Sequence, residues 1–409
     1  MSATMTHIDK KNTLAPKLRF KDKSGKQFPV WEEKKLGAIS KIYDGTHQTP
    51  TYVSEGIPFY SVEHITANQF TKTKYITQEV FDKENEKVRL EKGDILMTKI
   101  GDIGTSKLID WDVKASFYVS LALIKQSDSF SSKYLNQYIA SRNFQLELWK
   151  RIIHVAFPKK INLGEIGNCH VKLPTLPEQQ KIASFLSAVD EKLQQLTRKK
   201  QLLEQYKKGV MQQLFSGKLR FKDENGKAFP KWEEKRLGDV AIIKMGQSPD
   251  SKSYNTDSVG MLLIQGNADI NGRVTNPRQW TSEPTKICEI GDLILTVRAP
   301  VGSISKSLHH ACLGRGVCSI KNNKTSDIEF LFQFLLGYED KWKKIEQGST
   351  FTAVNGNEIN SLKLNVPSLP EQKKIATYLS NIDNKIENVN KQITQTQTFK
   401  KGLLQQMFV

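Results

Sequence analysis

A segment of twenty residues occurs twice in this chain of 409 residues. Residues 18–37 return at 219–238, with 15 of the 20 positions identical. A second motif, Leu-Pro-Glu-Gln-x-Lys-Ile-Ala, begins at Leu176 and again at Leu369. Because self-similarity of this length is the signature of repeated structure, the chain is predicted to contain two similar modules, each followed by a similar tail.

The regions between the repeated segments differ from each other. They share only short motifs, such as the Gly-Asp turns at Gly93 and Gly291, each followed by an apolar run that ends in threonine. A retained scaffold around unlike interiors is typical of paired modules that recognise different targets. The alternative, an old duplication that only enlarged the protein, stays open on the residues alone.

Two long helices are predicted, in residues 171–217 and 363–409. Pro177 and Pro370 lie near the expected starts, where a missing backbone N–H costs nothing. Apolar residues then recur in alternating steps of four and three, the heptad pattern of a coiled coil. At about 1.5 Å per residue, an antiparallel pair reaching about 57 Å would act as a spacer. The residues expected to pair the helices are Ile182, Leu186, Val189, Leu193, Leu196 and Leu203 in the first, and Ile375, Leu379, Ile382, Ile386, Val389 and Ile393 in the second.

The segments 18–170 and 218–362 are predicted to be mixed α+β domains. Short β-rich runs between Gly, Pro and Asp turns occur at 57–62, 117–124, 262–265 and 293–297, and amphipathic stretches at 132–153 and 327–346 predict helices. The expected fold is therefore α+β: two pseudo-symmetric mixed α/β domains separated by two long antiparallel coiled-coil helices. Residues 1–17 are expected to form a flexible basic tail.

Composition narrows the class of ligand. The chain carries 61 Lys and Arg against 43 Asp and Glu, a formal net charge of +18. Such an excess favours a polyanionic partner, because cations near phosphates release condensed counterions, although many basic proteins merely have solvated lysines. No apolar run approaches the roughly 18 residues that span a bilayer, and the N-terminal residues lack the apolar region of a secretory signal. A cytoplasmic protein is expected.

Catalytic motifs are missing from the sequence. There is no Walker A stretch and no Gly-x-Gly-x-x-Gly. The nearest match to an adenine-methyltransferase motif, at residues 276–279, lacks the second proline and the aromatic residue. The four cysteines form no CxxC pair, which predicts reduced thiols and no metal site. The sequence therefore favours binding over catalysis.

Three features taken in order resemble the specificity subunit of type I restriction-modification systems. They are the repeated Leu-Gly start at Leu36 and Leu237, the Gly-Asp turns, and the Leu-Pro-Glu-Gln helix opening. The resemblance covers nearly the whole chain. It implies target recognition domains at 18–170 and 218–362, a central helical spacer region at 171–217 and a C-terminal one at 363–409. Each domain would read one half of a bipartite, asymmetric duplex DNA site, with the helices setting the gap.

The resemblance also implies partner subunits. Two methyltransferase (M) subunits would dock on the helical regions, and restriction (R) subunits would join through them. S-adenosylmethionine, ATP and magnesium would be bound by these partners, so this chain would carry no cofactor and catalyse nothing. A function of another class, a non-DNA scaffold whose coiled coil joins two small domains, is the alternative.

The residues expected to contact DNA lie on loops rich in donors and acceptors. In the first domain Gln48 is expected to pair with adenine in the major groove, and lysines are expected to contact phosphates. In the second domain Arg298 is the expected guanine contact. Solvated turn residues and plain surface charges are the alternative reading. The full set is Thr46, His47, Gln48, Lys99, Lys159, Lys160, Gln247, Ser248, Gln265, Asn267, Arg273, Arg278 and Arg298.

Overall fold

The contacts within the chain divide it into two compact units in the computed structural model. The structure describes residues 15–84, 86, 88–348 and 353–409, without the side chains of 343–348. Unit 1 comprises residues 1–196 and 392–409, and unit 2 comprises residues 197–391. Most of the predicted basic tail, residues 1–14, lies outside the described residues, and each unit is described below by itself.

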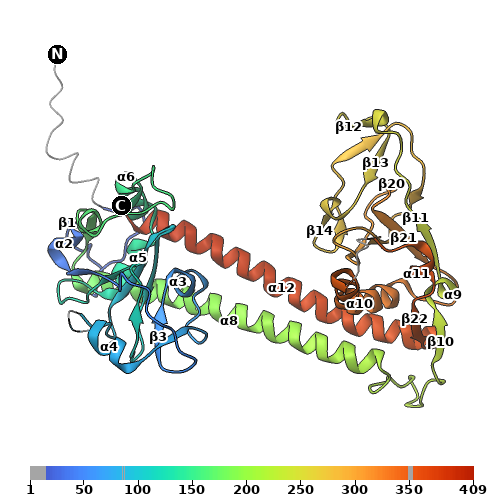
Figure 1. Ribbon diagram of the computed structural model, residues 1–409, viewed down its shortest axis with the longest axis horizontal. Helices are drawn as coiled ribbons and strands as arrows, with labels where there is room; N and C mark the ends of the chain where they lie inside the picture. The colour runs from blue at the N-terminus through green and yellow to red at the C-terminus, as the bar shows by residue number, and fades with distance from the viewer. Residues whose placement is uncertain (1–14, 85, 87, 349–352) are drawn as a thin grey trace. The chain divides into compact units, whose positions relative to one another are not determined.

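Unit 1 combines sheets with short helices (Figure 1). Its strands form the sheets β2-β8-β5-β6 and β4-β3-β7 and the ribbon β1-β9. The strands are β1 (Glu32–Lys35), β2 (Ile42–Asp44), β3 (Ile57–Tyr60), β4 (Lys74–Ile76), β5 (Ile95–Ile100), β6 (Asp102–Leu108), β7 (Ser116–Phe117), β8 (Leu121–Ile124) and β9 (His170–Leu173). The helices are α2 (Leu36–Ile39), α3 (Val62–Ala67), α4 (Gln78–Glu84), α5 (Ser132–Ile139), α6 (Arg142–Arg151) and α7 (Leu163–Gly167).

Unit 2 is built in the same way. Its sheets are β11-β21-β18-β19-β15-β14 and β12-β16-β13-β20-β17, with the ribbon β10-β22. The strands are β10 (Glu233–Arg236), β11 (Ala241–Met245), β12 (Tyr254–Asn255), β13 (Met261–Ile264), β14 (Ile270–Asn271), β15 (Val274–Thr275), β16 (Gln279–Thr281), β17 (Ile287–Cys288), β18 (Leu293–Thr296), β19 (Ile304–Lys306), β20 (Ala311–Leu313), β21 (Val317–Asn322) and β22 (Lys363–Val366). The helices are α9 (Leu237–Val240), the 3₁₀ turns η1 (Ser251–Ser253) and η2 (Asn267–Asp269), α10 (Ile328–Gly348) and α11 (Gly356–Asn360).

The strands of both unit 1 sheets have counterparts in the larger sheets of unit 2. The order β2-β8-β5-β6 matches β11-β21-β18-β19, and every neighbouring pair in both sets is antiparallel. The order β4-β3-β7 matches β16-β13-β20, where the last pair is parallel in both units. The predicted α+β class and the repeated scaffold are thereby confirmed.

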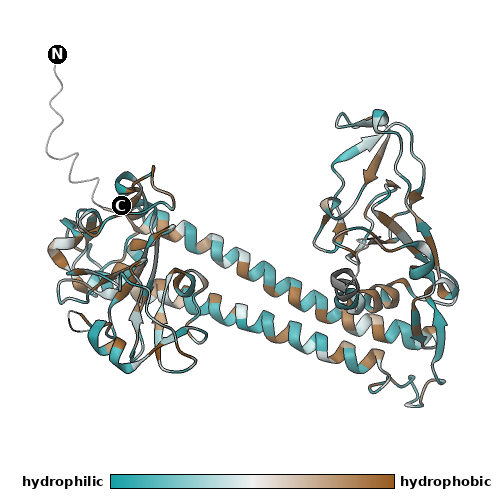
Figure 2. Ribbon diagram, viewed as in Figure 1, coloured by the Kyte–Doolittle hydropathy of each residue, from teal (hydrophilic) through white to brown (hydrophobic). Residues whose placement is uncertain are grey.

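Two long helices complete the units: α8 (Leu176–Phe215) and α12 (Leu369–Met407). Each contributes one part to each unit, and within a unit the two parts lie side by side and run antiparallel (Figure 1). In unit 2 Lys207 pairs with Asp383, and Lys200 donates to the Asn390 side chain. Apolar residues recur at intervals along both helices (Figure 2). The helix starts agree with the positions of Pro177 and Pro370, which are the second residues of their helices.

The residues expected to pair the helices are buried or half-buried throughout. Near the helix ends they also enter the globular cores. Ile182 and Leu186 belong to the unit 1 cluster that contains Trp31, and Ile375 and Leu379 belong to the unit 2 cluster. The apolar stripe therefore packs both on the other helix and on the adjacent domain.

The duplicated motifs meet at the start of each long helix. In unit 1 the fully buried Glu178 accepts hydrogen bonds from the Arg19 guanidinium at 2.7 and 2.8 Å and from Trp31 Nε1 at 3.2 Å. In unit 2 Glu371 accepts the same bonds from Arg220 and Trp232. A buried carboxylate needs such partners, and in each unit the two repeated segments together form one ion-paired joint.

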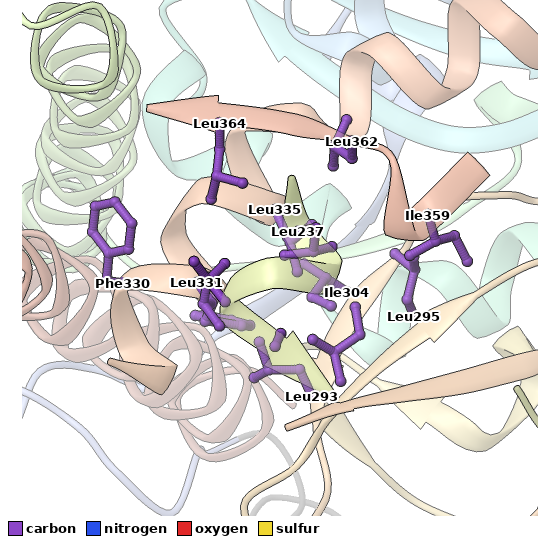
Figure 3. Packing of buried hydrophobic residues seen from close by; sticks show 14 of the residues in the cluster. Leu237, Leu293, Leu295, Ile304, Phe330, Leu331, Leu335, Ile359, Leu362 and Leu364 are labelled. Atoms are coloured by element: carbon purple, nitrogen blue, oxygen red, sulfur yellow. The ribbon is translucent and has the colours of Figure 1, made fainter. Parts of the chain in front are cut away.

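The core of unit 2 shows how the sheet and helices are joined. Side chains from strand β18, such as Leu293, meet Leu237 of α9 and Leu331 of α10 (Figure 3). All of these are completely buried. At about 25 cal/mol per Å² of apolar surface removed from water, burial of such side chains is the main term that stabilises the unit.

One predicted helix is divided in the structure. The stretch 132–153 forms α5 and α6, which are separated at Ala140 and Ser141. Ser141 is buried and its hydroxyl accepts from the backbone N–H of Phe144, which caps the start of α6. The prediction of a single helix was therefore wrong. The amphipathic pattern did not reveal the break, because both helices bury one face and the pattern continues from one to the other. The predicted helix 327–346 corresponds to α10.

Candidate nucleic-acid interface

The predicted residues of unit 1 gather at one edge of the sheet β2-β8-β5-β6. The strands β2 and β5 both end there, since each runs antiparallel to β8 between them. Asp44, at the end of β2, forms an ion pair with Lys99 at 2.8 Å, and its carboxylate also lies 3.3 Å from His47 Nε2. This carboxylate thereby links the loop after β2 to the end of β5.

These residues differ sharply in the exposure of their side chains. The His47 side chain is 72% exposed, whereas that of Lys99 is only 8% exposed. Lys99 lies in a strand that is buried on both faces and its ammonium is occupied by Asp44, so it presents no free cation to a phosphate. Thr46 is also buried and donates its hydroxyl hydrogen to Glu84 at 2.8 Å. His47 and the exposed Gln48 remain accessible on this loop.

Lys159 and Lys160 reach the same edge from another part of the chain. The backbone N–H of Gly101 donates to the Lys159 carbonyl at 2.8 Å, and that of Ile153 donates to the Lys160 carbonyl at 2.8 Å. Both lysine side chains are exposed. The structure therefore brings these lysines beside the end of β5, close to the loop that carries His47.

The tip of this lysine-bearing loop is apolar. Val155 is 97% exposed and Phe157 is fully exposed. The sequence does not show this exposure of Phe157, because it depends on the geometry of the loop. An apolar tip beside two cations is an arrangement that suits a nucleic acid, which offers both bases and phosphates.

The corresponding edge of unit 2 carries different side chains. Gln247 and Ser248 follow β11, and Arg298 follows β18, with Gln247 and Arg298 exposed. Gln265 Nε2 donates to Gln279 Oε1 at 3.0 Å, and the Gln265 backbone N–H donates to Asp269. These polar groups form a second candidate surface, equivalent in position to that of unit 1.

The other predicted residues of unit 2 are partly occupied. Arg278 lies 3.4 Å from Asp269 with its side chain 65% exposed, and Asn267 is exposed in η2. Arg273 is held by Glu339 of α10 through two of its nitrogens. A guanidinium whose two terminal nitrogens both bond a carboxylate has fewer donors left for a base edge. Arg273 is therefore the residue of the predicted set that is least suited to contact DNA.

Sequence reasoning missed Arg315. It lies between Gly314 and Gly316 in the turn that joins β20 to β21, and it is exposed although both glycines are buried. Its backbone N–H donates to Ser248 Oγ at 3.2 Å, which places it beside a predicted residue. The only sequence signal is the Gly-Arg-Gly triplet, which has no meaning before the neighbouring loops are known.

Thiol and metal chemistry depend on the placement of the cysteines and of the side chains that can ligate a metal. All four cysteines are buried and free. Burial raises the pKa of the Cys169 and Cys318 thiols to about 12, which makes them poor nucleophiles. Among the residues that the structure describes, no group of three or more His, Cys, Asp or Glu side chains could hold a metal ion. No described helix is both long and apolar enough to cross a bilayer.

Comparison with known proteins identifies relatives of the whole chain. Residues 30–205 and 230–397 match the family model of the type I restriction modification DNA specificity domain. The MjaX type I restriction enzyme specificity subunit of Methanocaldococcus jannaschii is 30% identical over 390 residues, which cover 91% of this chain and 92% of that protein. The MjaVIII specificity subunit of the same organism is 26% identical over 418 residues, covering 94% of both chains.

Solved structures share the fold. The type I restriction-modification S subunit from M. genitalium is similar with a TM-score of 0.62 and 16% identity, covering 97% of this chain and 99% of that one. A chain from a study of complex assembly and conformational transition of the type I R-M system has a TM-score of 0.60 and 22% identity, covering 92% and 97%. The repeated modules, the long helices and the two matched regions lead to one conclusion: this chain belongs to the specificity subunits of type I restriction-modification systems.

Proposed function

We propose that this chain reads a bipartite, asymmetric duplex DNA site, with the domain at 18–170 taking one half and the domain at 218–362 taking the other. The observation that carries the proposal is that equivalent edges of equivalent sheets bear different side chains. His47 and Gln48 follow β2, whereas Gln247 and Ser248 follow β11. Base edges are distinguished by the donors and acceptors of side chains, so unlike loops on one scaffold suit two unlike half-sites.

Positive charge supports DNA as the ligand. The chain has a net charge of +18, and the exposed Lys159 and Lys160 lie at the edge that carries His47. Contacts of this kind position a protein on phosphates without reading sequence. In this proposal the lysines orient unit 1 on the duplex, and the loop side chains supply its specificity.

We propose further that α8 and α12 set the gap between the half-sites and dock two methyltransferase (M) subunits, which in turn recruit restriction (R) subunits. Exposed apolar residues on α8 within unit 2 support a partner-covered surface: Leu202 and Tyr206, one helical turn apart, are 48% and 52% exposed. Monomeric proteins rarely leave such side chains grouped in water.

The proposal assigns no reaction to this chain. S-adenosylmethionine, ATP and magnesium are cofactors of the partner subunits in this account, and the complex acts in the cytoplasm, where it meets DNA. The chain contributes binding, orientation and the choice of sequence.

The experiment that tests the proposal is a mobility-shift titration of the full chain together with its methyltransferase subunits. It compares a duplex that carries both half-sites with a scrambled duplex of equal length. We expect specific binding to be tighter by a factor of about 10³ or more at physiological salt. Equal affinity for both duplexes would overturn sequence recognition. A non-DNA scaffold, the alternative function, would show no binding to either at that salt concentration.

A further inference from the structure

The turn between β20 and β21 holds one exposed arginine on a closely packed backbone. Gly314 and Gly316 are buried, and Arg315 between them is exposed. A Cβ atom added to Gly316 would overlap the carbonyl oxygen of Gln265, and one added to Gly246 would overlap that of Gly314. The loops that carry Gly246 and Gln265 therefore approach the turn so closely that side chains are excluded at these glycines.

Hydrogen bonds fix the turn on several sides. The N–H of Gly314 donates to the Ile264 carbonyl at 2.8 Å, and the N–H of Val297 donates to the Gly316 carbonyl at 2.9 Å. The Arg315 N–H itself donates to Ser248 Oγ at 3.2 Å. A long cationic side chain is thus mounted on a rigid base at the edge of the sheet, which reduces the entropy lost when it binds a ligand.

The guanidinium of Arg315 is also available. Arg273 is engaged by Glu339, and Arg278 lies near Asp269. Within the part of the chain that the structure describes, Arg315 pairs with no carboxylate. The Arg315 backbone N–H donates to Ser248 Oγ, and Gln265 lies against the flanking Gly314 and Gly316.

The equivalent turn of unit 1 has a different chemistry. It joins β7 to β8 and carries Tyr118 and Val119, and the N–H of Lys99 donates to the Ser120 carbonyl as that of Val297 does to Gly316. Tyr118 and Val119 are half-buried. The same position in the scaffold therefore presents a cation in unit 2 and no charge in unit 1.

We infer that Arg315 is a specificity-determining residue that contacts a guanine in the half-site read by unit 2, an inference that rests on the proposed function. A guanidinium donates two parallel hydrogen bonds, and guanine offers the matching pair of acceptors, O6 and N7, in the major groove. No other base presents two acceptors there. Arg315 thus joins the predicted Arg298 at this edge and gives the second half-site a requirement for guanine that the first need not share.

The inference is tested with the full chain and its methyltransferase subunits, by competition among duplexes that each carry one base change in either half-site. The variants are R315A, the charge-retaining R315K, and K363Q as a control for the loss of one exposed charge on unit 2. We expect R315A to lose discrimination at one G·C pair by about 5- to 150-fold and R315K to lose part of it. Preferences in the other half-site stay unchanged, and K363Q behaves as the unchanged chain.

Two results would overturn this role. One is unchanged base preference in R315A; the other is equal weakening on every duplex with a shallower salt dependence, which indicates a phosphate contact. Failure of the unchanged chain to prefer any sequence would remove the proposed function together with this inference. A chain that retains its preferences when Arg315 is removed would leave the proposed function standing. Circular dichroism of R315A checks that the exposed substitution leaves the fold intact.

Discussion

The ammonium of Lys207 lies 2.6 Å from Oδ1 of Asp383, between the two long helices within unit 2. The Lys207 side chain is only 8% exposed. Lys400 and Asp190 make the same contact in unit 1, also at 2.6 Å. Each aspartate accepts a further bond at 2.7 Å from a glutamine of the globular domain, Gln333 or Gln137. These two ion pairs are therefore points where both helices and the adjacent globular domain are tied together.

Removing one partner of this pair is expected to destabilise unit 2. Burial lowers the pKa of Lys207 and Asp383 opposes that effect, so D383A leaves a buried ammonium without its counter-charge. Because Asp383 is 38% exposed, we expect a loss of about 2 kcal/mol, less than the roughly 3–5 kcal/mol of a wholly buried pair. Urea unfolding measures it, with the exposed Lys385→Ala as control. The double variant K207M/D383L should recover most of the loss; if it is as unstable as D383A, the unpaired charge is not the cause.

The joint at the start of each long helix is expected to stabilise its own unit. Glu178→Ala removes the acceptor of Arg19 and Trp31, and should weaken unit 1 by about 3–5 kcal/mol because the carboxylate is completely buried. Glu371→Ala should do the same to unit 2. Amide hydrogen exchange resolves the two units in one sample. Equal loss of protection in both units from either variant would be inconsistent with separate joints.

Acid is expected to lower the stability of unit 1 by protonating Glu147. Burial raises the pKa of this carboxyl, but hydrogen bonds from Lys150 and His170 and the charge of Arg151 outweigh it and lower the pKa from 4.5 to about 2. A folded-state pKa below the unfolded value gives stability that is present above about pH 4.5 and is lost as the pH falls toward 2. Urea unfolding at pH 5 and pH 3 should therefore show a smaller drop for E147Q than for the unchanged chain. Identical drops would exclude this contribution.

Loss of Lys159 and Lys160 is expected to weaken DNA binding without changing which sequence is preferred. Each phosphate contact adds about 0.9 to the slope of log affinity against log salt, so the double alanine variant should be shallower by about 2. Titrations at several salt concentrations measure this slope. Lys23 and Lys26, also exposed on unit 1, provide a matched double variant that should keep the original slope. An unchanged slope after removal of Lys159 and Lys160 would place them off the DNA.

The sequence predicted the features that repeat, because repetition and heptad spacing are local patterns. The two modules and the α+β class followed from the duplicated segments, and the helix starts followed from Pro177 and Pro370. The division of residues 132–153 was missed, since a buried serine cap inside an amphipathic stretch is visible only once Ser141 is seen to bond Phe144.

The candidate interface was harder to predict, because exposure depends on strands and loops that are far apart in the sequence. Lys99 looked like a surface cation, yet it lies in a buried strand and is paired with Asp44. Arg315 was missed, because its position beside Ser248 and Gln265 depends on loops that are far apart in the sequence. The assignment of individual residues to DNA contacts remains a prediction.

The most direct test of the account is selection from a random duplex library by the full chain with its methyltransferase subunits, before and after residues 18–170 are exchanged for those of another specificity subunit. The account predicts two short preferred blocks at a constant spacing, of which the exchange alters one and leaves the second block and the spacing unchanged. A single uninterrupted motif, or an exchange that alters both blocks, would contradict it.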